Sequence, residues 1–555
     1  MSPTASWTAK TTYPVLTRRI PCWPHGNPKD RHTVWLDEYL RPPANTGAGT
    51  LGGYESLRKT ITTMTPDEVV EHVKKAVLRG RGGAGFPAGM KWSFLPKPDA
   101  NGDGGQRYLA INADESEPAS FKDRLLMDFD PHSVLEGIAI ACYACRIQTA
   151  YFYIRGEYHH QAKVMEKAIR ECYERGIFGK QGLLQGTRTK NRDQAWGLDV
   201  HLHRGAGAYI CGEETGLLES IEGKRGWPRN KPPFPAIKGL FARPTIINNV
   251  ETLAHVPSIM EMGWEWFSKQ GCDSTFAGAP ASWGTKLMGV SGHVNRPGVY
   301  ECDLGIPLRV LIESKDYCNG MRNGKKFKGA IAGGISMGVL GPDQMDAEMD
   351  FDIGRKYNVL GLGTACPTVF DEDTDMVAVA RNIARFYKHE SCGQCTPCRE
   401  GSGWLYQLLT RIESGAAKTK DLDLALEIAT SMGTMPGTTI CGLADGNNWA
   451  VRTIMNKYPQ EFEARVKRTF VPVGISVGAG AKCGGDGGRW RSVRRASVGA
   501  WQESMRLSHT PRGPQHRRPP RPSLLIRTAR VRQTSFWTLP PPARRALYGE
   551  PSDRA

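Results

Sequence analysis

The pattern of apolar and polar residues predicts an amphipathic helix that begins just after residue 64. Thr65 is suited to be its N-cap, Pro66 suits the first helical position, and Glu68 can close a capping box with Thr65. Apolar residues then recur at helical spacing from position 69 to position 77. We expect this helix to end at Gly80.

Farther along the chain, short runs of β-type residues alternate with helical patterns. Strands are predicted at 108–111, 150–154 and 199–203, and helices at 131–146 and 157–175. Strands that alternate with helices in this way favour an α/β domain with a largely parallel sheet.

The pattern changes twice more before the C-terminus. Residues 285–340 combine short β segments with Gly/Pro turns and one short helix, which indicates a small α+β domain. Helical patterning dominates from 375 to about 467. From 471 onward there is no apolar period, and Gly, Pro, Arg and Ser prevail, so we expect either disorder or an artefact of the gene model.

Charge changes this picture little, although the formal net charge of the 555 residues is +17. The segment 471–555 holds 15 Arg and one Lys against four acidic residues, so it carries most of the excess. A nucleic-acid-binding role based on this segment is the least favoured alternative, because its aromatic residues are scattered. No apolar run approaches the roughly 18 residues of a membrane span, and the N-terminus lacks the apolar segment of a secretory signal.

A glycine-rich stretch follows the first predicted helix, with Gly80, Gly82 and Gly85 in the spacing G-x-G-x-x-G. It is not a standard dinucleotide fingerprint, because a helix precedes it and a strand follows. A flexible turn is the plain alternative. Glycines let backbone N–H groups approach a phosphate closely, and Arg79, Arg81 and Lys91 would add positive charge. Nearby aromatic rings, which suit a stacked ring cofactor, belong to Phe86, Trp92 and Phe94.

Three cysteines form the strongest local motif, Cys392-x-x-Cys395-x-x-Cys398. Thiolates at this spacing are typical of iron–sulfur ligation, whereas zinc prefers paired C-x-x-C knuckles. Cys441 is the best candidate for the fourth ligand, and Cys366 is the reserve candidate. Three cysteines on apolar helix faces, Cys142, Cys145 and Cys172, are interpreted as core residues.

Taken together, these motifs closely resemble one family, the NADH-binding flavoprotein subunit of respiratory complex I. The resemblance covers about residues 14–465 and rests on six motifs in the family's order. They are RGRGGAGF (79–86), NADESEP (112–118), GAGAYICGEET (205–215), KPPFP (231–235), NNVET (248–252) and ESCGQCTPCREG (390–401).

The resemblance implies a Rossmann-like FMN and NADH domain with an atypical glycine loop, a ubiquitin-like SLBB domain and a C-terminal helical bundle that carries the cluster. The corresponding divisions are 1–60 (loop-rich segment), 61–270 (FMN and NADH domain), 271–345 (SLBB domain), 346–468 (helical [4Fe–4S] domain) and 469–555 (basic tail).

The resemblance also assigns cofactor contacts by position. The FMN contacts it implies are Gly80, Gly82, Lys91, Asn112, Asp114, Tyr209, Gly212, Glu213, Asn248, Asn249 and Thr252. The NADH contacts are Phe86, Phe94, Glu117, Glu214, Lys231 and Phe234. Glu115 and Ser116 lie in the same acidic turn and are included in the site. The ligands implied for the [4Fe–4S] cluster are Cys392, Cys395, Cys398 and Cys441.

The implied activity is that of an NADH:quinone oxidoreductase of the translocase class, in which FMN takes hydride from NADH and the cluster accepts single electrons. Implied partners are the E-type [2Fe–2S] protein and the G-type protein of the peripheral arm of complex I, with quinone reached through the complex. We expect a peripheral place on the cytoplasmic side of a bacterial membrane, with the mitochondrial matrix side as alternative. The functional alternative is a diaphorase subunit of an NAD-linked hydrogenase or formate dehydrogenase.

Nucleotide choice is a further expectation. A carboxylate near the ribose would disfavour NADPH, because it would repel the 2′-phosphate. Glu117, or failing that Glu214, is expected to discriminate between NADH and NADPH.

Overall fold

The computed structural model describes residues 15–20, 24, 31–42, 52–97, 105–181, 184–185, 187–190, 197–433 and 438–466. The predicted tail 469–555 and most of the first 30 residues lie outside the described residues. Among the described residues, no helix is long and apolar enough to cross a membrane.

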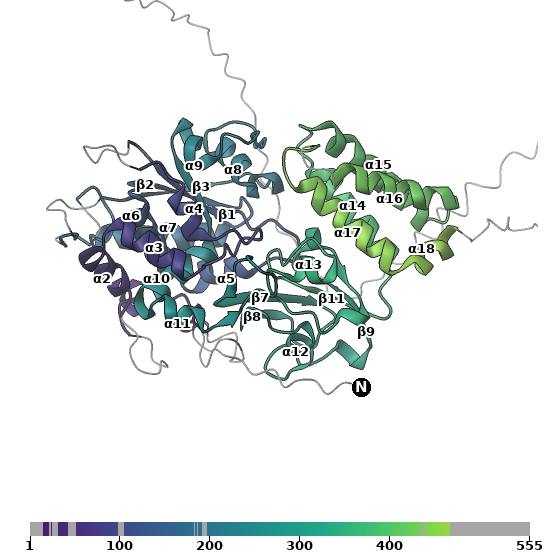
Figure 1. Cartoon of the computed structure of the whole chain (residues 1–555), viewed down its shortest axis with the longest axis horizontal. Helices are drawn as coiled ribbons and strands as arrows, with labels where there is room; N and C mark the ends of the chain where they lie inside the picture. Colours follow the sequence, from purple (N-terminus) through teal and green to yellow (C-terminus); the bar gives the residue numbers. More distant parts are fainter. Residues whose placement is uncertain are drawn as a thin grey trace, which may run out of the picture. The chain divides into compact units, whose positions relative to one another are not determined.

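The first half of the chain contains a four-stranded parallel sheet (Figure 1). Its strands are β1 (Tyr108–Ala113), β2 (Thr149–Ile154), β3 (Asp199–Arg204) and β4 (Thr245–Asn249), in the order β3-β2-β1-β4. All three pairings are parallel. The predicted α/β class with a parallel sheet is therefore confirmed, and β4 is a strand that the sequence pattern did not predict.

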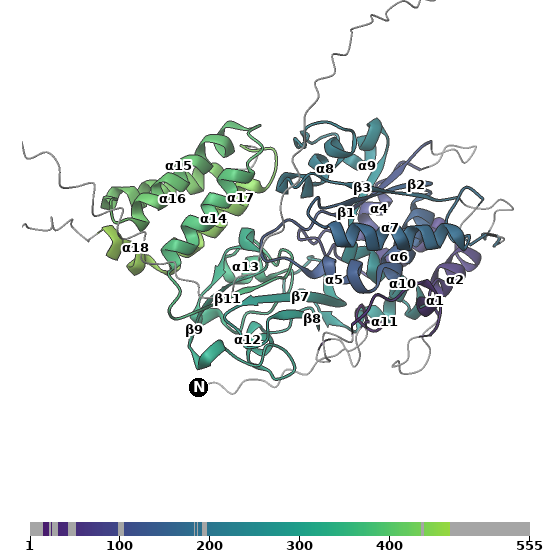
Figure 2. The same ribbon diagram turned by 180° about the vertical axis from the view of Figure 1, so that it is seen from behind.

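Helices pack on both faces of this sheet. Alternate strand residues such as Leu109 and Phe152 join an apolar core with the fully buried α6, and α7 and α10 lie beside it (Figures 1 and 2). Residues on the other face, such as Ala110 and Ile247, join a second core with α8. The helices of this half are α1 (Leu36–Tyr39), α2 (Glu55–Thr63), α3 (Pro66–Lys75), α4 (Ala88–Ser93), α5 (Lys122–Phe129), α6 (Pro131–Cys145), α7 (His159–Glu174), α8 (Glu214–Ile221), α9 (Pro235–Lys238), α10 (Val250–Met262) and α11 (Trp264–Ser268).

The predicted capping box of α3 is present. The Thr65 hydroxyl accepts a hydrogen bond from the Glu68 N–H (3.3 Å), and the Glu68 carboxylate accepts one from the Thr65 N–H (2.6 Å). The helix ends at Lys75, earlier than the predicted Gly80, because Val77 has the left-handed φ of 47° that no α-helix continues through.

A second sheet of five strands has the order β10-β9-β11-β7-β8. Its central strand β11 lies beyond residue 345, so the sheet continues into the sequence that follows the predicted small domain. The strands of this part are β5 (Gly271–Cys272), β6 (Ser282–Trp283), β7 (Thr285–Gly292), β8 (Gly298–Asp303), β9 (Phe327–Ile331), β10 (Val339–Leu340) and β11 (Thr368–Asp371), and its helices are α12 (Leu308–Glu313) and α13 (Ile353–Tyr357).

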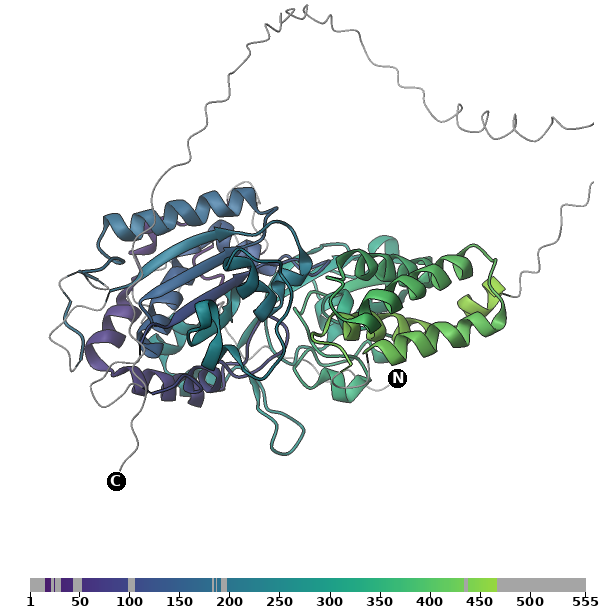
Figure 3. The same ribbon diagram turned by 90° about the horizontal axis from the view of Figure 1, so that it is seen from above.

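The C-terminal described part is helical, as predicted, and its helices run side by side (Figure 3). They are α14 (Met376–Glu390), α15 (Thr396–Glu413), α16 (Thr419–Gly433), α17 (Leu443–Lys457) and α18 (Pro459–Val466). Apolar residues on one stripe of each helix form their shared core.

One buried carboxylate ties the N-terminal segments to α6. Glu136 accepts hydrogen bonds from the Tyr39 hydroxyl (2.6 Å), the Tyr54 N–H (3.0 Å) and the Leu57 N–H (3.0 Å). All four residues are buried. Three donors would therefore lose their partner if this carboxylate were removed.

We predict that Glu136→Ala lowers the free energy of unfolding by about 3 kcal/mol, because buried donors left unpaired each cost about 1–3 kcal/mol. Urea unfolding measures the change. Glu166→Ala on the exposed face of α7 is the control and should stay within about 0.5 kcal/mol of the parent. A similar, small loss in both variants would contradict the assigned role of Glu136.

Candidate cofactor and cluster sites

Two neighbouring cavities lie beside the parallel sheet. The first lies at the carboxyl ends of β1 and β4, the edge where open α/β sheets bind ligands, and the second lies along residues 245–247 of β4. Their volumes are about 530 and 920 Å³, within the range of pockets that hold small molecules and cofactors. Ala84 and Glu213 line both cavities, so the two spaces are adjacent.

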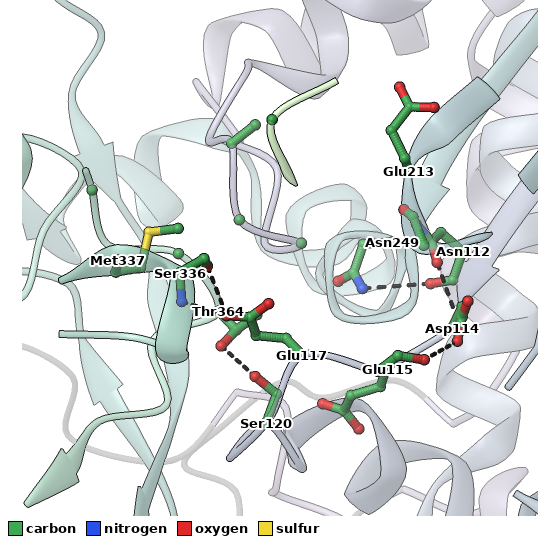
Figure 4. A pocket seen from close by; sticks show the side chains of 18 of the residues that line it. Asn112, Asp114, Glu115, Glu117, Ser120, Glu213, Asn249, Ser336, Met337 and Thr364 are labelled. Carbon is green, nitrogen blue, oxygen red and sulfur yellow. Dashed lines mark hydrogen bonds between the residues drawn. The ribbon is translucent and has the colours of Figure 1, made fainter. Parts of the chain in front are cut away.

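The first cavity brings together most of the residues that the resemblance assigned to FMN (Figure 4). It also contains Glu117, which the resemblance assigned to NADH. The predicted site residues that line it are Gly82, Asn112, Asp114, Glu115, Ser116, Glu117, Tyr209, Gly212, Glu213 and Asn249.

The second cavity collects the aromatic and basic residues. Phe86, Phe94 and Phe234 are 44%, 51% and 58% exposed, an unusual state for large apolar rings, and the Phe86 and Phe94 ring centroids lie 5.9 Å apart. Such rings offer a surface on which a planar ligand can stack. The predicted site residues that line this cavity are Phe86, Lys91, Phe94, Glu213, Glu214, Lys231 and Phe234.

Three predicted residues line neither cavity but support the walls. The Asn248 side-chain oxygen accepts a hydrogen bond from the Trp92 indole (2.8 Å), and the Thr252 hydroxyl accepts one from the Arg81 N–H (2.8 Å). The Gly80 N–H donates to the Phe86 carbonyl (2.9 Å). Asn248, Thr252 and Gly80 thus stabilise the glycine loop and its neighbours.

Glycine is required in the loop because other groups approach it closely. A Cβ atom on Gly82 would lie 3.0 Å from Cβ of Asn249, and one on Gly85 would lie 2.5 Å from the Phe351 ring. Gly85 also has a positive φ of 66°. The loop is therefore pressed against the end of β4, where its backbone borders the first cavity.

Arg81 was expected to add positive charge beside the loop, but it lines neither of the two cavities. Its guanidinium is fully buried and donates to the carbonyls of Arg79 (3.1 Å) and Trp283 (2.7 Å). Arg79 lines the first cavity, and its side chain donates to the Gly85 carbonyl (2.7 Å). Lys91 borders the second cavity, where its ammonium lies 3.5 Å from the Glu214 carboxylate.

The carboxylates of the acidic turn have separate surroundings. Burial raises the pKa of Asp114 to about 7, and the Ser116 hydroxyl donates to this carboxylate. The Glu115 carboxylate accepts from two N–H groups at the start of α5 and from the Tyr158 hydroxyl, so it caps a helix. Glu117 accepts from the Tyr209 hydroxyl and from Ser336, and burial raises its pKa.

Ion pairs connect the two cavities. The Lys231 ammonium lies 2.6 Å from the Glu214 carboxylate and 3.0 Å from that of Glu213. Burial alone would raise the pKa of Glu214, but Lys91 and Lys231 bring it below its ordinary value. Glu214 is consequently an anion held between two cations.

The four cysteines of the predicted cluster site lie in one apolar group at the start of α15 and α17. Burial raises the pKa of Cys441, and the neighbouring Glu213, Cys398 and Cys392 raise it further. Cys366 is instead buried beside Lys286 in the second sheet.

No group of three or more His, Cys, Asp or Glu side chains in the described ranges is arranged to hold a single metal ion. This is compatible with an iron–sulfur cluster, because each thiolate then binds a different iron atom and the ligands stand farther apart. Four thiols in one apolar group fit such a cluster, and the glycine-walled first cavity fits a flavin nucleotide.

Sequence reasoning missed the wall that the second sheet contributes to the first cavity. This wall includes Ser336, Met337 and the segment 360–364. The glycine pairs at 333–334 and 361–363 were the available signal, since they allow close backbone approach.

Comparison with known proteins agrees with this arrangement. The model of the Nuo51 FMN-binding domain matches residues 73–258, and that of the NADH-ubiquinone oxidoreductase-F iron-sulfur binding region matches residues 378–465. The fold and the site therefore define an iron–sulfur flavoprotein.

Two curated relatives show to which family of iron–sulfur flavoproteins the chain belongs. The second F-type subunit of the NADH-quinone oxidoreductase of Rhizobium meliloti is 47% identical over 421 residues, which cover 76% of this chain and 94% of that protein. The mitochondrial NADH dehydrogenase [ubiquinone] flavoprotein 1 of Dictyostelium discoideum is 44% identical, with 80% and 88% covered. The chain belongs to this family of complex I flavoprotein subunits.

A solved structure is also similar, the NAD+-reducing [NiFe]-hydrogenase in its air-oxidised state. It is 32% identical with a TM-score of 0.62, and the match covers 74% of this chain and 64% of that chain.

Asp114 provides a test of the first cavity. A carboxyl whose pKa rises from 3.8 to about 7 binds a proton more tightly in the folded chain. Its contribution to stability is therefore complete below about pH 4 and is lost as the pH rises through about 7. An asparagine at this position cannot ionise, so Asp114→Asn should raise the Tm of the cofactor-free chain at pH 8 by about 2–4 °C and should raise it much less at about pH 4.5.

Differential scanning fluorimetry at both pH values measures this effect. Asp423→Asn on the exposed face of α16 is the matched control and should show no pH-dependent gain. An Asp114→Asn chain that gains equally at both pH values would contradict the burial of an ionisable carboxyl at this position.

Proposed function

We propose that this chain oxidises NADH at a bound FMN and passes the electrons singly to a [4Fe–4S] cluster. The observation that carries the proposal is the composition of one cavity wall. Asn112, Asp114 and Asn249 border the first cavity on the sheet side, and Cys441 borders the same cavity from the helical bundle. A cofactor in this cavity would lie beside a ligand of the cluster.

The first cavity would hold FMN. The backbone around Gly82 would face its phosphate, and the polar side chains of Asn112, Asp114 and Asn249 would bond its ribityl and ring atoms. Bound FMN supplies the redox chemistry, because it takes hydride as an electron pair and releases electrons one at a time. Cys392, Cys395, Cys398 and Cys441 would ligate the cluster.

The second cavity would bind NADH. Its exposed Phe rings would stack on the planar parts of the dinucleotide, and Lys91 and Lys231 would attract the phosphates. Because Ala84 and Glu213 border both cavities, a nicotinamide ring could reach the first cavity from the second. The chain's task is to align the two rings and to exclude water, so no protein acid or base is needed.

The wider assignments follow from family membership. The chain would be a peripheral subunit of the NADH:quinone oxidoreductase, in contact with the E-type [2Fe–2S] protein and the G-type protein, and quinone would be reduced elsewhere in the complex. The domain limits at 60, 270 and 468 and the cytoplasmic or matrix side of the membrane belong to the same proposal, and the limit expected at 345 is moved beyond β11, the central strand of the second sheet. The curated relatives favour complex I over the hydrogenase alternative.

The test is spectroscopy of the anaerobically purified chain. We expect flavin absorbance that NADH bleaches, together with the EPR signal of a reduced [4Fe–4S] cluster. Cys441→Ala should abolish the EPR signal while FMN remains bound, and Cys366→Ala is the matched control that should keep it. A chain without flavin, or an unchanged signal in Cys441→Ala, would contradict the proposal.

Nucleotide choice gives a second prediction. Glu214 lines the second cavity with the Phe rings, whereas Glu117 lines the first, so Glu214 is tested first. A carboxylate near the ribose repels the 2′-phosphate of NADPH. Glu214→Gln should therefore shift the NADH to NADPH ratio of kcat/KM toward NADPH by about 1–2 kcal/mol.

The measurement uses ferricyanide as electron acceptor with both nucleotides. Glu427→Gln on the exposed face of α16 should leave the ratio unchanged. If Glu214→Gln also leaves it unchanged, the discriminating carboxylate is not Glu214, and Glu117→Gln becomes the variant that decides.

A further inference from the structure

A chain of buried charges leads from the second sheet to the wall of the first cavity. It runs from Lys286 on β7 to Glu251 on α10, then to Lys122 and Asp123 at the start of α5. The four side chains are at most 5% exposed, so their charges have lost nearly all contact with water. Buried charges of this kind must satisfy one another.

The distances along this chain are those of direct ion pairs. The Lys286 ammonium lies 2.6 Å from the Glu251 carboxylate, and the Lys122 ammonium lies 2.9 Å from the same oxygen of Glu251. Lys122 is also 2.7 Å from the Asp123 carboxylate. Two cations therefore compete for Glu251, and two anions compete for Lys122.

The chain of charges ends at a residue of the proposed flavin site. The Asn249 amide N–H donates to the second oxygen of Asp123 (2.8 Å), and the Asn249 side-chain oxygen lies 3.5 Å from the Lys122 ammonium. That oxygen also accepts the Glu251 N–H (3.0 Å), which caps α10. Asp123 and Asn249 both line the first cavity.

We propose that Lys286 and Glu251 are positioning residues for the flavin pocket, acting through Lys122 and Asp123 on the Asn249 amide. The proposal rests on the proposed function, since it takes the first cavity to be the FMN site. Lys286 holds part of the Glu251 charge, so Lys122 stays between Glu251 and Asp123. Asp123 then fixes which edge of the Asn249 amide faces the cavity.

The arrangement makes β7 of the second sheet a part of the flavin site, although Lys286 does not line the cavity. Lys286 also donates to the Leu287 carbonyl (3.1 Å), and Glu251 accepts the Leu287 N–H (2.9 Å). The Leu287 N–H thereby fastens the start of β7 to α10, while the Leu287 carbonyl is bonded by Lys286 of the same strand. A substitution that changes the charge of Lys286 should accordingly change the affinity of the first cavity for FMN.

The test compares FMN binding to the full chain with Lys286→Met, with the double variant Lys286→Met/Glu251→Gln, and with Lys315→Met as control. Lys315 is an exposed lysine of the same part of the chain. In Lys286→Met, Glu251 draws Lys122 away from Asp123, and the Kd for FMN should rise about tenfold. In the double variant this pull is gone, so FMN binding should recover toward the wild-type value. The flavin midpoint potential should shift and recover in parallel.

The outcomes separate the possibilities. A wild-type chain that does not bind FMN refutes the proposed function itself. If wild type binds FMN and Lys286→Met lowers only the Tm, with the Kd and potential unchanged, the charges merely stabilise the fold and the positioning role is wrong. A double variant that binds FMN more weakly than the single variant has the same consequence, because lost packing rather than lost charge balance would then dominate.

Should Lys286→Met fail to fold, Lys286→Gln takes its place, because its amide can still donate to Glu251 while the charge is absent. If neither variant folds although the double variant folds and binds FMN normally, the chain of charges is a folding element only and the proposal falls.

Discussion

The site depends on one close contact, the approach of the glycine loop to the end of β4. A Cβ atom on Gly82 would lie 3.0 Å from that of Asn249, closer than an ordinary van der Waals contact. This contact places flexible backbone against the amide-bearing ends of two parallel strands, where their N–H groups and side chains face one space. Every residue proposed to hold the flavin is arranged around that meeting point.

Buried charged side chains stabilise the contact between the glycine loop and β4. Arg81 ties the loop to Trp283, and Lys122 and Asp123 brace Asn249. These groups would be costly inside the protein if any were left alone, so each partner constrains the others. The rear wall thus contains mutually paired buried charges, whereas the opposite wall consists of the exposed rings and ion pairs of the second cavity.

The helical bundle adds the electron acceptor without a separate binding surface for the flavin. Cys441 borders the first cavity, and the three other thiols lie in the same apolar group. A redox cofactor and a cluster that share one wall need no moving part between them. Because Cys441 borders the first cavity, the nucleotide-binding sheet and the distant cysteine motif would bring the two redox centres together within one chain.

The sequence by itself determined the local chemistry: the capping box at Thr65, the parallel α/β pattern, the glycine loop and the cysteine motif all depend on neighbouring residues. Tertiary structure alone decided which groups share a cavity. Sequence reasoning ranked Glu117 ahead of Glu214 as the residue that discriminates between the nucleotides, yet the two line different cavities, and Glu214 is the one beside the Phe rings. Arg81 was expected to add positive charge beside the glycine loop, yet its side chain is buried, and Lys286 gave no signal at all. Such relations join residues far apart along the chain, and only the packing of helices and sheets brings their side chains within reach of one another.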